Sequence, residues 1–209
     1  MKSFVVQFWK GIFNTFRWVS VFHILRQIIP EMKSSGWVDL WVLFNFVLSF
    51  ACLFFLVNIA SNWLLVILIA WGAVRVFEII VYQATVLLFD PYEQKKSAPP
   101  YALRGYRRLL ILIIQNYIEI AAWFGSFYIV GRTYFIDNNC VLKSSAGALY
   151  YSIVTMTTLG YGDVTPNSAW TRLLVSAQAL TGVFMVAVIV ARFISFLPKP
   201  QTLDDSEKE

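Results

Sequence analysis

Residues 157–163 read Thr-Thr-Leu-Gly-Tyr-Gly-Asp, and their types and spacing suit a cation site made of backbone oxygens. Gly160 and Gly162 alternate with bulkier residues, and glycine adopts left-handed backbone conformations without steric cost. This alternation lets consecutive carbonyls point in one direction, as a ring of oxygens that replaces the water around a potassium ion requires. The run lies between two long apolar segments, at the end of a short helix-like stretch.

Apolar blocks dominate the rest of the chain and predict an integral membrane protein. Its 209 residues are 58% hydrophobic and 14% charged, whereas soluble domains carry roughly 25% charged residues. A short stretch, residues 146–157, rises only about 18 Å as a helix, so we expect it to enter a hydrocarbon core of about 30 Å and turn back. The predicted fold class is an all-α membrane protein with four transmembrane helices, this re-entrant helix and an N-terminal helix at the membrane surface. The four predicted spans are residues 37–57, 63–89, 109–130 and 169–197.

Basic residues gather on one side of these spans. Lys and Arg are frequent before the first span and between the second and the third, and sparse on the side of residues 157–163. The positive-inside rule therefore predicts a multi-pass protein of the cell membrane with both termini in the cytoplasm. The net charge of +5 comes mainly from the cytoplasmic segments, so it indicates anionic lipids at that face as partners, and not nucleic acid.

The stretch from residue 109 to residue 197 contains a span, an outer loop, a short re-entrant helix, the glycine-containing run and a second span. This order and the sequence Thr-Leu-Gly-Tyr-Gly-Asp resemble the two-span pore module of prokaryotic channels in the tetrameric potassium channel family. The resemblance implies that backbone carbonyls of residues 158–161 bind potassium ions, and that Leu159 replaces a more frequent valine without losing this role. One chain supplies one strand of the ring, so a homotetrameric pore is expected. The implied filter residues are Thr158, whose hydroxyl also contributes, Leu159, Gly160, Tyr161 and Gly162.

The same resemblance implies residues that support the filter. In the family, two aromatic residues of the pore helix donate hydrogen bonds to the filter, which here predicts the pairs Tyr150 with Asp163 and Tyr151 with Tyr161. Both tyrosines also fit a simpler role as membrane-interface aromatics. Val154 stands where some bacterial relatives carry a glutamate, which argues against inactivation like theirs. The predicted support residues are Thr157, Asp163, Tyr150, Tyr151 and Val154.

The last span resembles the inner helix of the family. Gly182 matches the position of a gating-hinge glycine, but glycine in a membrane helix also permits close packing. Downstream apolar residues at helical spacing then face the pore and predict a constriction that closes by dewetting. These residues are Val183, Val186, Val190 and Ile194.

Arg75 is a charge within the second predicted span, where an arginine costs roughly 2.5–3.5 kcal/mol on insertion scales. Glu78, three residues on, is its local candidate partner, and Glu119 of the third span is a more distant one. A voltage sensor needs several such arginines on one helix, so we interpret the cluster as structural.

By these arguments the chain divides into five segments. Residues 1–36 contain an amphipathic helix, predicted to lie in the headgroup region or, alternatively, to pack against the bundle. Residues 37–89 predict a transmembrane hairpin, and residues 90–108 a basic cytoplasmic linker. Residues 109–197 form the pore domain, and residues 198–209 a tail too short to fold as a ligand-binding domain.

The predicted function is passive, potassium-selective conduction through a tetrameric pore without a voltage sensor. The alternatives are a non-selective cation channel of the same fold, a subunit of a potassium transporter, or an accessory subunit of another channel. No enzymatic constellation and no organic cofactor are expected, and His23 is interpreted as an interfacial residue. Cys52 suits packing, whereas Cys140 in the outer loop is a free thiol or pairs with Cys140 of a neighbouring copy.

Overall fold

Four long helices form the membrane part of the protein. The computed structural model describes residues 4–17, 35–55, 62–88 and 106–195. All four helices are long and apolar enough to cross a membrane, which confirms the predicted all-α membrane fold with four spans. They are α3 (Ser35–Phe55), α4 (Asn62–Leu88), α6 (Tyr106–Val130) and α8 (Ala169–Ser195).

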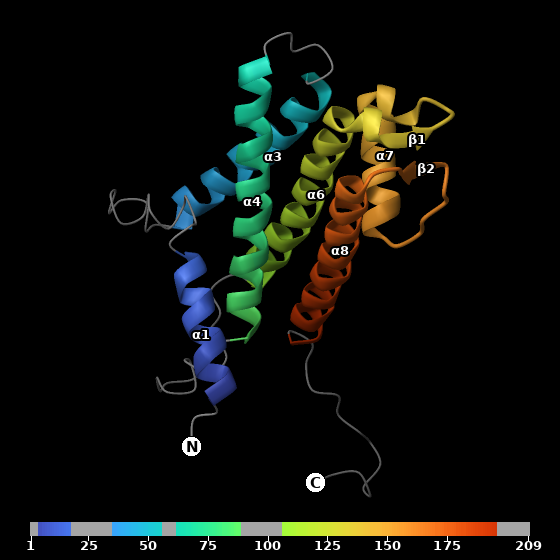
Figure 1. The fold of residues 1–209 in the computed structure, drawn as a ribbon. Coiled ribbons are helices and arrows are strands. Elements are labelled where there is room, and N and C mark those ends of the chain that lie inside the picture. The colour runs from blue at the N-terminus through green and yellow to red at the C-terminus, as the bar shows by residue number, and fades with distance from the viewer. Residues whose placement is uncertain (1–3, 18–34, 56–61, 89–105, 196–209) are drawn as a thin grey trace, which may run out of the picture.

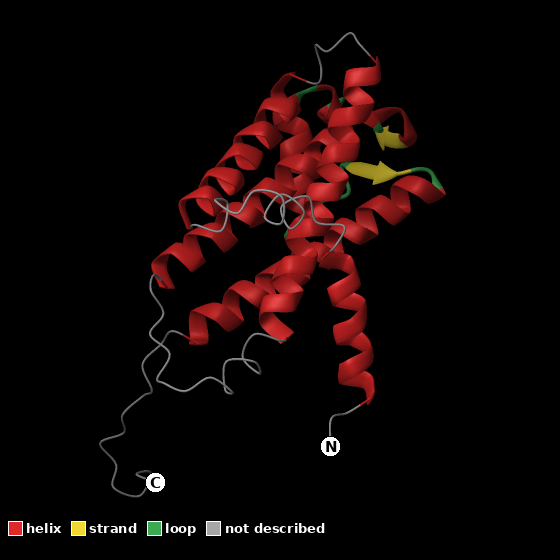
Figure 2. Ribbon diagram, turned by 90° about the vertical axis from the view of Figure 1, so that its left-hand side faces the viewer, coloured by secondary structure: helices red, strands yellow, loops and turns green. Residues whose placement is uncertain are grey.

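Helix α6 is the centre of the bundle, because α3, α4, α7 and α8 all pack against it. In Figure 1 it lies between α4 and α8, with α3 crossing the bundle diagonally, and Figure 2 shows the same helices from the side. Its inward residues include Trp123 and Tyr128, both fully buried. The core therefore surrounds α6, and the first two spans pack directly on the predicted pore domain.

The first two spans diverge. Helix α3 makes most of its contacts with α6, whereas α4 contacts α6, α8 and the N-terminal helix. The two spans still meet at one polar contact, since Trp71 Nε1 donates to Asn45 Oδ1 over 3.0 Å. Because α3 and α4 contact α6 more than they contact each other, α6 determines the course of each span.

The N-terminal helix α1 (Phe4–Arg17) packs on α4, where the ring of Phe16 lies 5.3 Å from that of Phe77. This contact corresponds to the packing alternative for this helix, while its other aromatic side chains are largely exposed. The predicted cytoplasmic linker, the C-terminal tail and His23 lie largely or wholly outside the described residues.

The predicted re-entrant helix is α7 (Ser145–Met156). The hydroxyl of Ser144 caps it by accepting from Gly147 N over 3.0 Å, and Ser145 Oγ donates to the carbonyl of Leu53 in α3. Helix α8 begins in the same way, because Ser168 and Thr171 exchange side-chain and backbone hydrogen bonds in a reciprocal cap.

Two short strands were not predicted. Strand β1 (Phe135–Asp137) follows α6, and β2 (Val164–Pro166) follows the glycine-containing run. They pair antiparallel, with Phe135 opposite Pro166 and Asp137 opposite Val164. The pairing holds the chain after the predicted filter against the segment after α6, at the end of the bundle where α7 lies (Figure 1).

Candidate functional site

The filter residues continue directly from the end of α7. Thr157 is the C-cap residue of α7, and Thr158, which follows it, has a positive φ of 60°. Thr158 N donates to the carbonyl of Thr155 over 3.1 Å, and Leu159 N donates to that of Val154 over 3.0 Å. These two bonds and the left-handed residue form a Schellman motif, a common way to end a helix. The motif ties the first filter residues to the last turn of α7.

Left-handed conformations alternate along the filter strand. The φ angles of Thr158, Gly160 and Gly162 are 60°, 57° and 78°, whereas Leu159 and Tyr161 have no positive φ. Because left-handed and right-handed residues turn the backbone in opposite senses, their alternation keeps the strand extended and directs successive carbonyls to one side. A positive φ costs a β-branched residue such as threonine of the order of 1–3 kcal/mol, a strain typical of functional sites.

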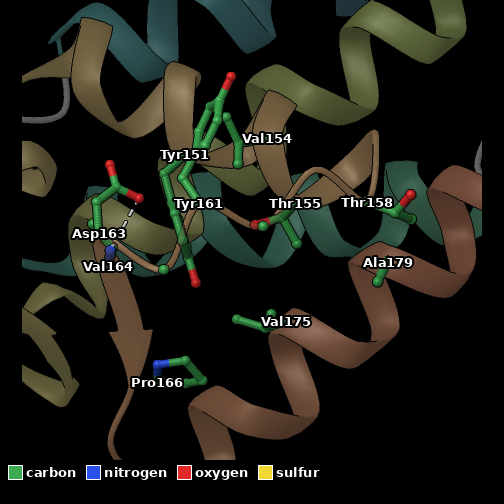
Figure 3. A pocket seen from close by; sticks show the side chains of 12 residues that line it. Tyr151, Val154, Thr155, Thr158, Tyr161, Asp163, Val164, Pro166, Val175 and Ala179 are labelled. Atoms are coloured by element: carbon green, nitrogen blue, oxygen red, sulfur yellow. Dashed lines mark hydrogen bonds between the residues drawn. The ribbon is translucent and has the colours of Figure 1, made fainter.

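The strand is open on one side and backed by a hollow on the other. The side chains of Leu159 and Tyr161 are 57% and 67% exposed in the single chain. A hollow of about 290 Å³ separates the strand from Val175 and Ala179 of α8, and Figure 3 shows these residues facing each other across it. A strand with this much exposed surface has room for neighbouring chains on both sides.

Tyr150 lies beside Asp163 at the end of the predicted filter strand. Desolvation, and then the neighbouring Asp163 carboxylate, raise the pKa of the Tyr150 phenol. The Tyr150 ring also stacks on that of Tyr161, with centroids 6.4 Å apart and planes 8° apart. Asp163 Oδ1 in turn accepts from Val164 N over 3.1 Å. The aspartate is thereby fixed at the start of β2.

Tyr151 packs inward in the single chain. Its ring lies edge-on to that of Tyr128, 4.8 Å between centroids, and 5.8 Å from that of Phe135. Among the described residues of one chain, no hydrogen bond joins Tyr151 to Tyr161. Val154 contributes through its main chain, since its carbonyl accepts from both Leu159 N and Gly160 N.

A buried polar bridge behind the filter was not predicted. Gln178 of α8 donates from Nε2 to Ser152 Oγ over 2.6 Å and to the Ser152 carbonyl over 3.0 Å. Its Oε1 accepts from the Tyr128 hydroxyl of α6, and Ser152 Oγ donates to the Ala121 carbonyl over 2.6 Å. The available signal was a glutamine in an apolar span, since a buried amide needs partners.

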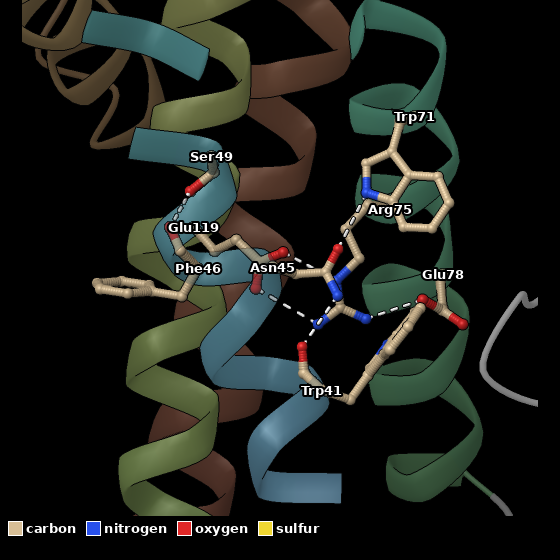
Figure 4. Close-up of polar contacts among 8 residues, drawn as sticks. All are labelled: Trp41, Asn45, Phe46, Ser49, Trp71, Arg75, Glu78 and Glu119. Carbon is tan, nitrogen blue, oxygen red and sulfur yellow. Dashed lines mark hydrogen bonds and ion pairs between the residues drawn. The ribbon is translucent and has the colours of Figure 1, made fainter. Parts of the chain in front are cut away.

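Arg75 lies between two carboxylates in the middle of the bundle (Figure 4). Its Nε donates to Glu119 Oε1 and its NH1 to Glu78 Oε2, both over 2.8 Å. All three side chains are at least nine-tenths buried. The cluster therefore joins α4 to α6, with both candidate partners of the arginine in contact.

Comparison with known proteins agrees with this geometry. Residues 109–199 match the family described as "Ion channel". The chain is 32% identical over 124 residues to the two-pore potassium channel 1 of Arabidopsis thaliana, covering 58% of this chain and 32% of that protein. Over these residues the chain is similar to potassium channels. Its four long apolar helices are those of a multi-pass membrane protein.

Other relatives match this chain over shorter stretches or at lower identity. It is 44% identical over 54 residues to the two pore potassium channel a of Oryza sativa subsp. japonica, covering 26% of this chain and 16% of that one. It is 26% identical over 113 residues to the voltage-gated potassium channel regulatory subunit KCNF1 of Homo sapiens, covering 52% of this chain and 22% of that protein. The chain thus spans about a third or less of these relatives. No solved structure matches it significantly.

In the last helix, α8, Gly182 is buried against the end of α7. A Cβ at this position would lie 2.1 Å from the Met156 carbonyl oxygen, so α8 approaches α7 only because residue 182 is glycine. Helix α8 continues without a break from Ala169 to Ser195. The structure thus gives Gly182 a packing role, and a hinge role stays a prediction.

The predicted constriction residues share the exposed side of α8. Each is about half exposed in the single chain, in keeping with a surface available to a pore or to other chains. These residues are Val183, Val186, Val190 and Ile194.

Proposed function

We propose that four copies of this chain form a potassium-selective channel that conducts passively. The observation that carries the proposal is the alternation of positive φ at Thr158, Gly160 and Gly162. Four such strands around one axis would surround a dehydrated potassium ion with the carbonyls of residues 158–161 and the Thr158 hydroxyl. The exposed outer surface of each strand is consistent with cover by neighbouring copies.

The filter sequence argues for selectivity. Non-selective relatives lose the filter tyrosine, whereas Tyr161 is present and stacks on Tyr150. The support pair Tyr150–Asp163 would hold the outer end of each strand. The partner pair Tyr151–Tyr161 would form between neighbouring copies, because within one chain Tyr151 faces Tyr128.

The proposed gating apparatus has no voltage sensor in the first two spans. Arg75 is the one Lys or Arg in α3 and α4, and two carboxylates bind it. Moving a single charge cannot supply the steep voltage dependence that three or four charges per subunit give. Both termini would be cytoplasmic, and anionic lipids would contact the basic segments at that face.

Reversal potentials test the proposal. The full-length chain, purified and reconstituted in liposomes, should form tetramers that pass potassium in strong preference to sodium. Equal permeability to the two ions would support the non-selective alternative. A tetramer without current would support the accessory alternative, which the regulatory-subunit relative favours.

A further inference from the structure

Gln178 has no direct role in the proposed conduction of potassium, because it lies outside the filter strand. It lies on α8, is fully buried, and uses both halves of its amide. The Nε2 group donates twice to Ser152 of α7, and Oε1 accepts from Tyr128 of α6. One side chain therefore holds three helices at once.

Every polar group of this bridge has a partner. The Tyr128 hydroxyl donates to Gln178, Gln178 donates to Ser152, and the Ser152 hydroxyl donates on to the Ala121 carbonyl. Tyr128 and Ser152 are as fully buried as Gln178. Because an unpaired buried donor or acceptor is costly, the bridge favours one rotation of α7 about its axis over its neighbours.

Rotation of α7 affects the filter directly. Ser152 precedes Val154 by two residues, and the Val154 carbonyl accepts from the backbone N–H groups of Leu159 and Gly160. Both residues belong to the same rigid helix, so a turn of α7 that moves Ser152 also moves the Val154 carbonyl. The amides of Leu159 and Gly160 must follow it, and their peptide planes carry the carbonyls proposed to face the ion.

A second contact from the same face of α8 holds the end of α7. Gly182 is one turn after Gln178, and its missing Cβ admits the Met156 carbonyl. Gln178 therefore acts on the rotation of α7, and Gly182 on its distance from α8. Neither residue lies in the filter strand.

We propose that Gln178 is a positioning residue that sets the ion selectivity of the filter through Ser152 and the rotation of α7. The role rests on the proposed potassium-selective function, and Gln178 itself touches no ion. Its removal should leave the carbonyl groups in place but let their direction vary, so that sodium is excluded less well.

Reversal potentials of reconstituted Gln178→Met channels test this role. Methionine keeps the length of the side chain and removes both the oxygen and the nitrogen of the amide. The potassium-to-sodium permeability ratio should fall about tenfold, the change that matches roughly 1.4 kcal/mol for one buried hydrogen bond. The matched control is Thr181→Val, because among the described residues the Thr181 hydroxyl bonds only to the Ala177 carbonyl of its own helix, and this variant should keep the wild-type ratio.

A second measurement separates positioning from general stability. Potassium that binds the folded channel raises its melting temperature relative to sodium. Gln178→Met should reduce this potassium-specific difference, whereas a purely structural role would lower the melting temperature equally in both salts. An equal loss in both salts together with an unchanged permeability ratio would overturn the proposal.

If Gln178→Met does not fold, two variants of Ser152 test the same role. Ser152→Ala removes the hydroxyl link to Ala121, and Ser152→Thr retains it. Selectivity should fall in the first variant and recover in the second, and equal selectivity in both would overturn the role. If the wild-type channel itself does not distinguish potassium from sodium, both the proposed function and the role of Gln178 fail. If the wild type is selective and Gln178→Met is equally selective, only the role of Gln178 is overturned.

Discussion

Arg75 of α4 donates hydrogen bonds to Glu119 of α6 near the middle of both helices, with 2.8 Å between Nε and Oε1. Its NH1 reaches Glu78 over the same distance, so one guanidinium serves two buried carboxylates. This contact is a buried charged link between α4 and the pore-domain helix α6. Helix α4 is therefore held to the pore domain by a charge cluster that is costly to break and costly to bury.

Arg75→Met should lower the free energy of unfolding by about 3–5 kcal/mol, because it leaves the two carboxylates buried without their cation. Titration with a denaturing detergent measures the change. The control is Arg108→Ala, which breaks a half-exposed pair with Asp39 and should cost less than about 1 kcal/mol. Adding Glu78→Gln and Glu119→Gln to Arg75→Met should restore most of the stability. If Arg75→Met leaves the free energy of unfolding unchanged, the interpretation of these three side chains as a charged cluster is wrong.

The spans and the filter glycines were predictable because their causes are local. The length of an apolar block decides whether a helix spans a bilayer, and Gly160 and Gly162 mark positions that need positive φ. Thr158 was not predictable in this way. A β-branched residue is disfavoured at φ of 60°, and the hydrogen bonds to the end of α7 impose this conformation on it.

Features that depend on a residue far away in the chain could not be predicted from the sequence. Strands β1 and β2 are three residues each, too short for an alternating pattern, and they pair across the intervening α7 and predicted filter. The packing role of Gly182 requires knowledge of the Met156 carbonyl beside it. Likewise, the glutamine at 178 marks a buried polar contact, but only the fold reveals that its partners are Ser152 and Tyr128.

Gly160→Ala tests the conformation of the filter strand. Within one chain, no atom lies within 4 Å of an added Cβ, so the strain there comes from the φ of 57° and not from a clash. A left-handed alanine costs roughly 1–2 kcal/mol, and we expect the strand to relax with loss of potassium selectivity and current. Gly36→Ala is the control, since its surroundings are equally open and its φ is not positive, and it should conduct normally. Wild-type selectivity in Gly160→Ala would argue against the carbonyl-ring geometry.

Gly182→Ala distinguishes packing from hinge bending. The new Cβ would lie 2.1 Å from a backbone oxygen that cannot move aside, so overpacking should destabilise the channel by about 1–3 kcal/mol. The melting temperature of the purified protein reports this loss. A pure hinge role predicts the opposite pattern, with stability kept or improved and only the open probability changed.

Tyr150→Phe tests the outer support of the filter. The variant keeps the stacking on Tyr161 and removes the hydroxyl beside the Asp163 carboxylate, so the potassium-specific rise in melting temperature should shrink while the fold persists. The expected pH dependence follows from the raised pKa of the phenol. Its contribution is fully present below the unfolded value of about 10 and is lost as pH rises through the higher folded value. The advantage of the wild-type protein over Tyr150→Phe should therefore disappear once the pH exceeds the folded pKa, and an advantage that persists there would rule out this hydroxyl as the cause.

Thiol labelling tests the proposed orientation. Cys140 is exposed in the loop before α7, whereas Cys52 is buried. If the filter faces outward, a membrane-impermeant maleimide should label right-side-out vesicles and leave sealed inverted vesicles unlabelled. Cys140→Ser should abolish the labelling, which identifies the site. Labelling that requires prior reduction would indicate a disulfide between Cys140 residues of neighbouring copies. Labelling of the inverted vesicles alone would reverse the topology and place both termini outside.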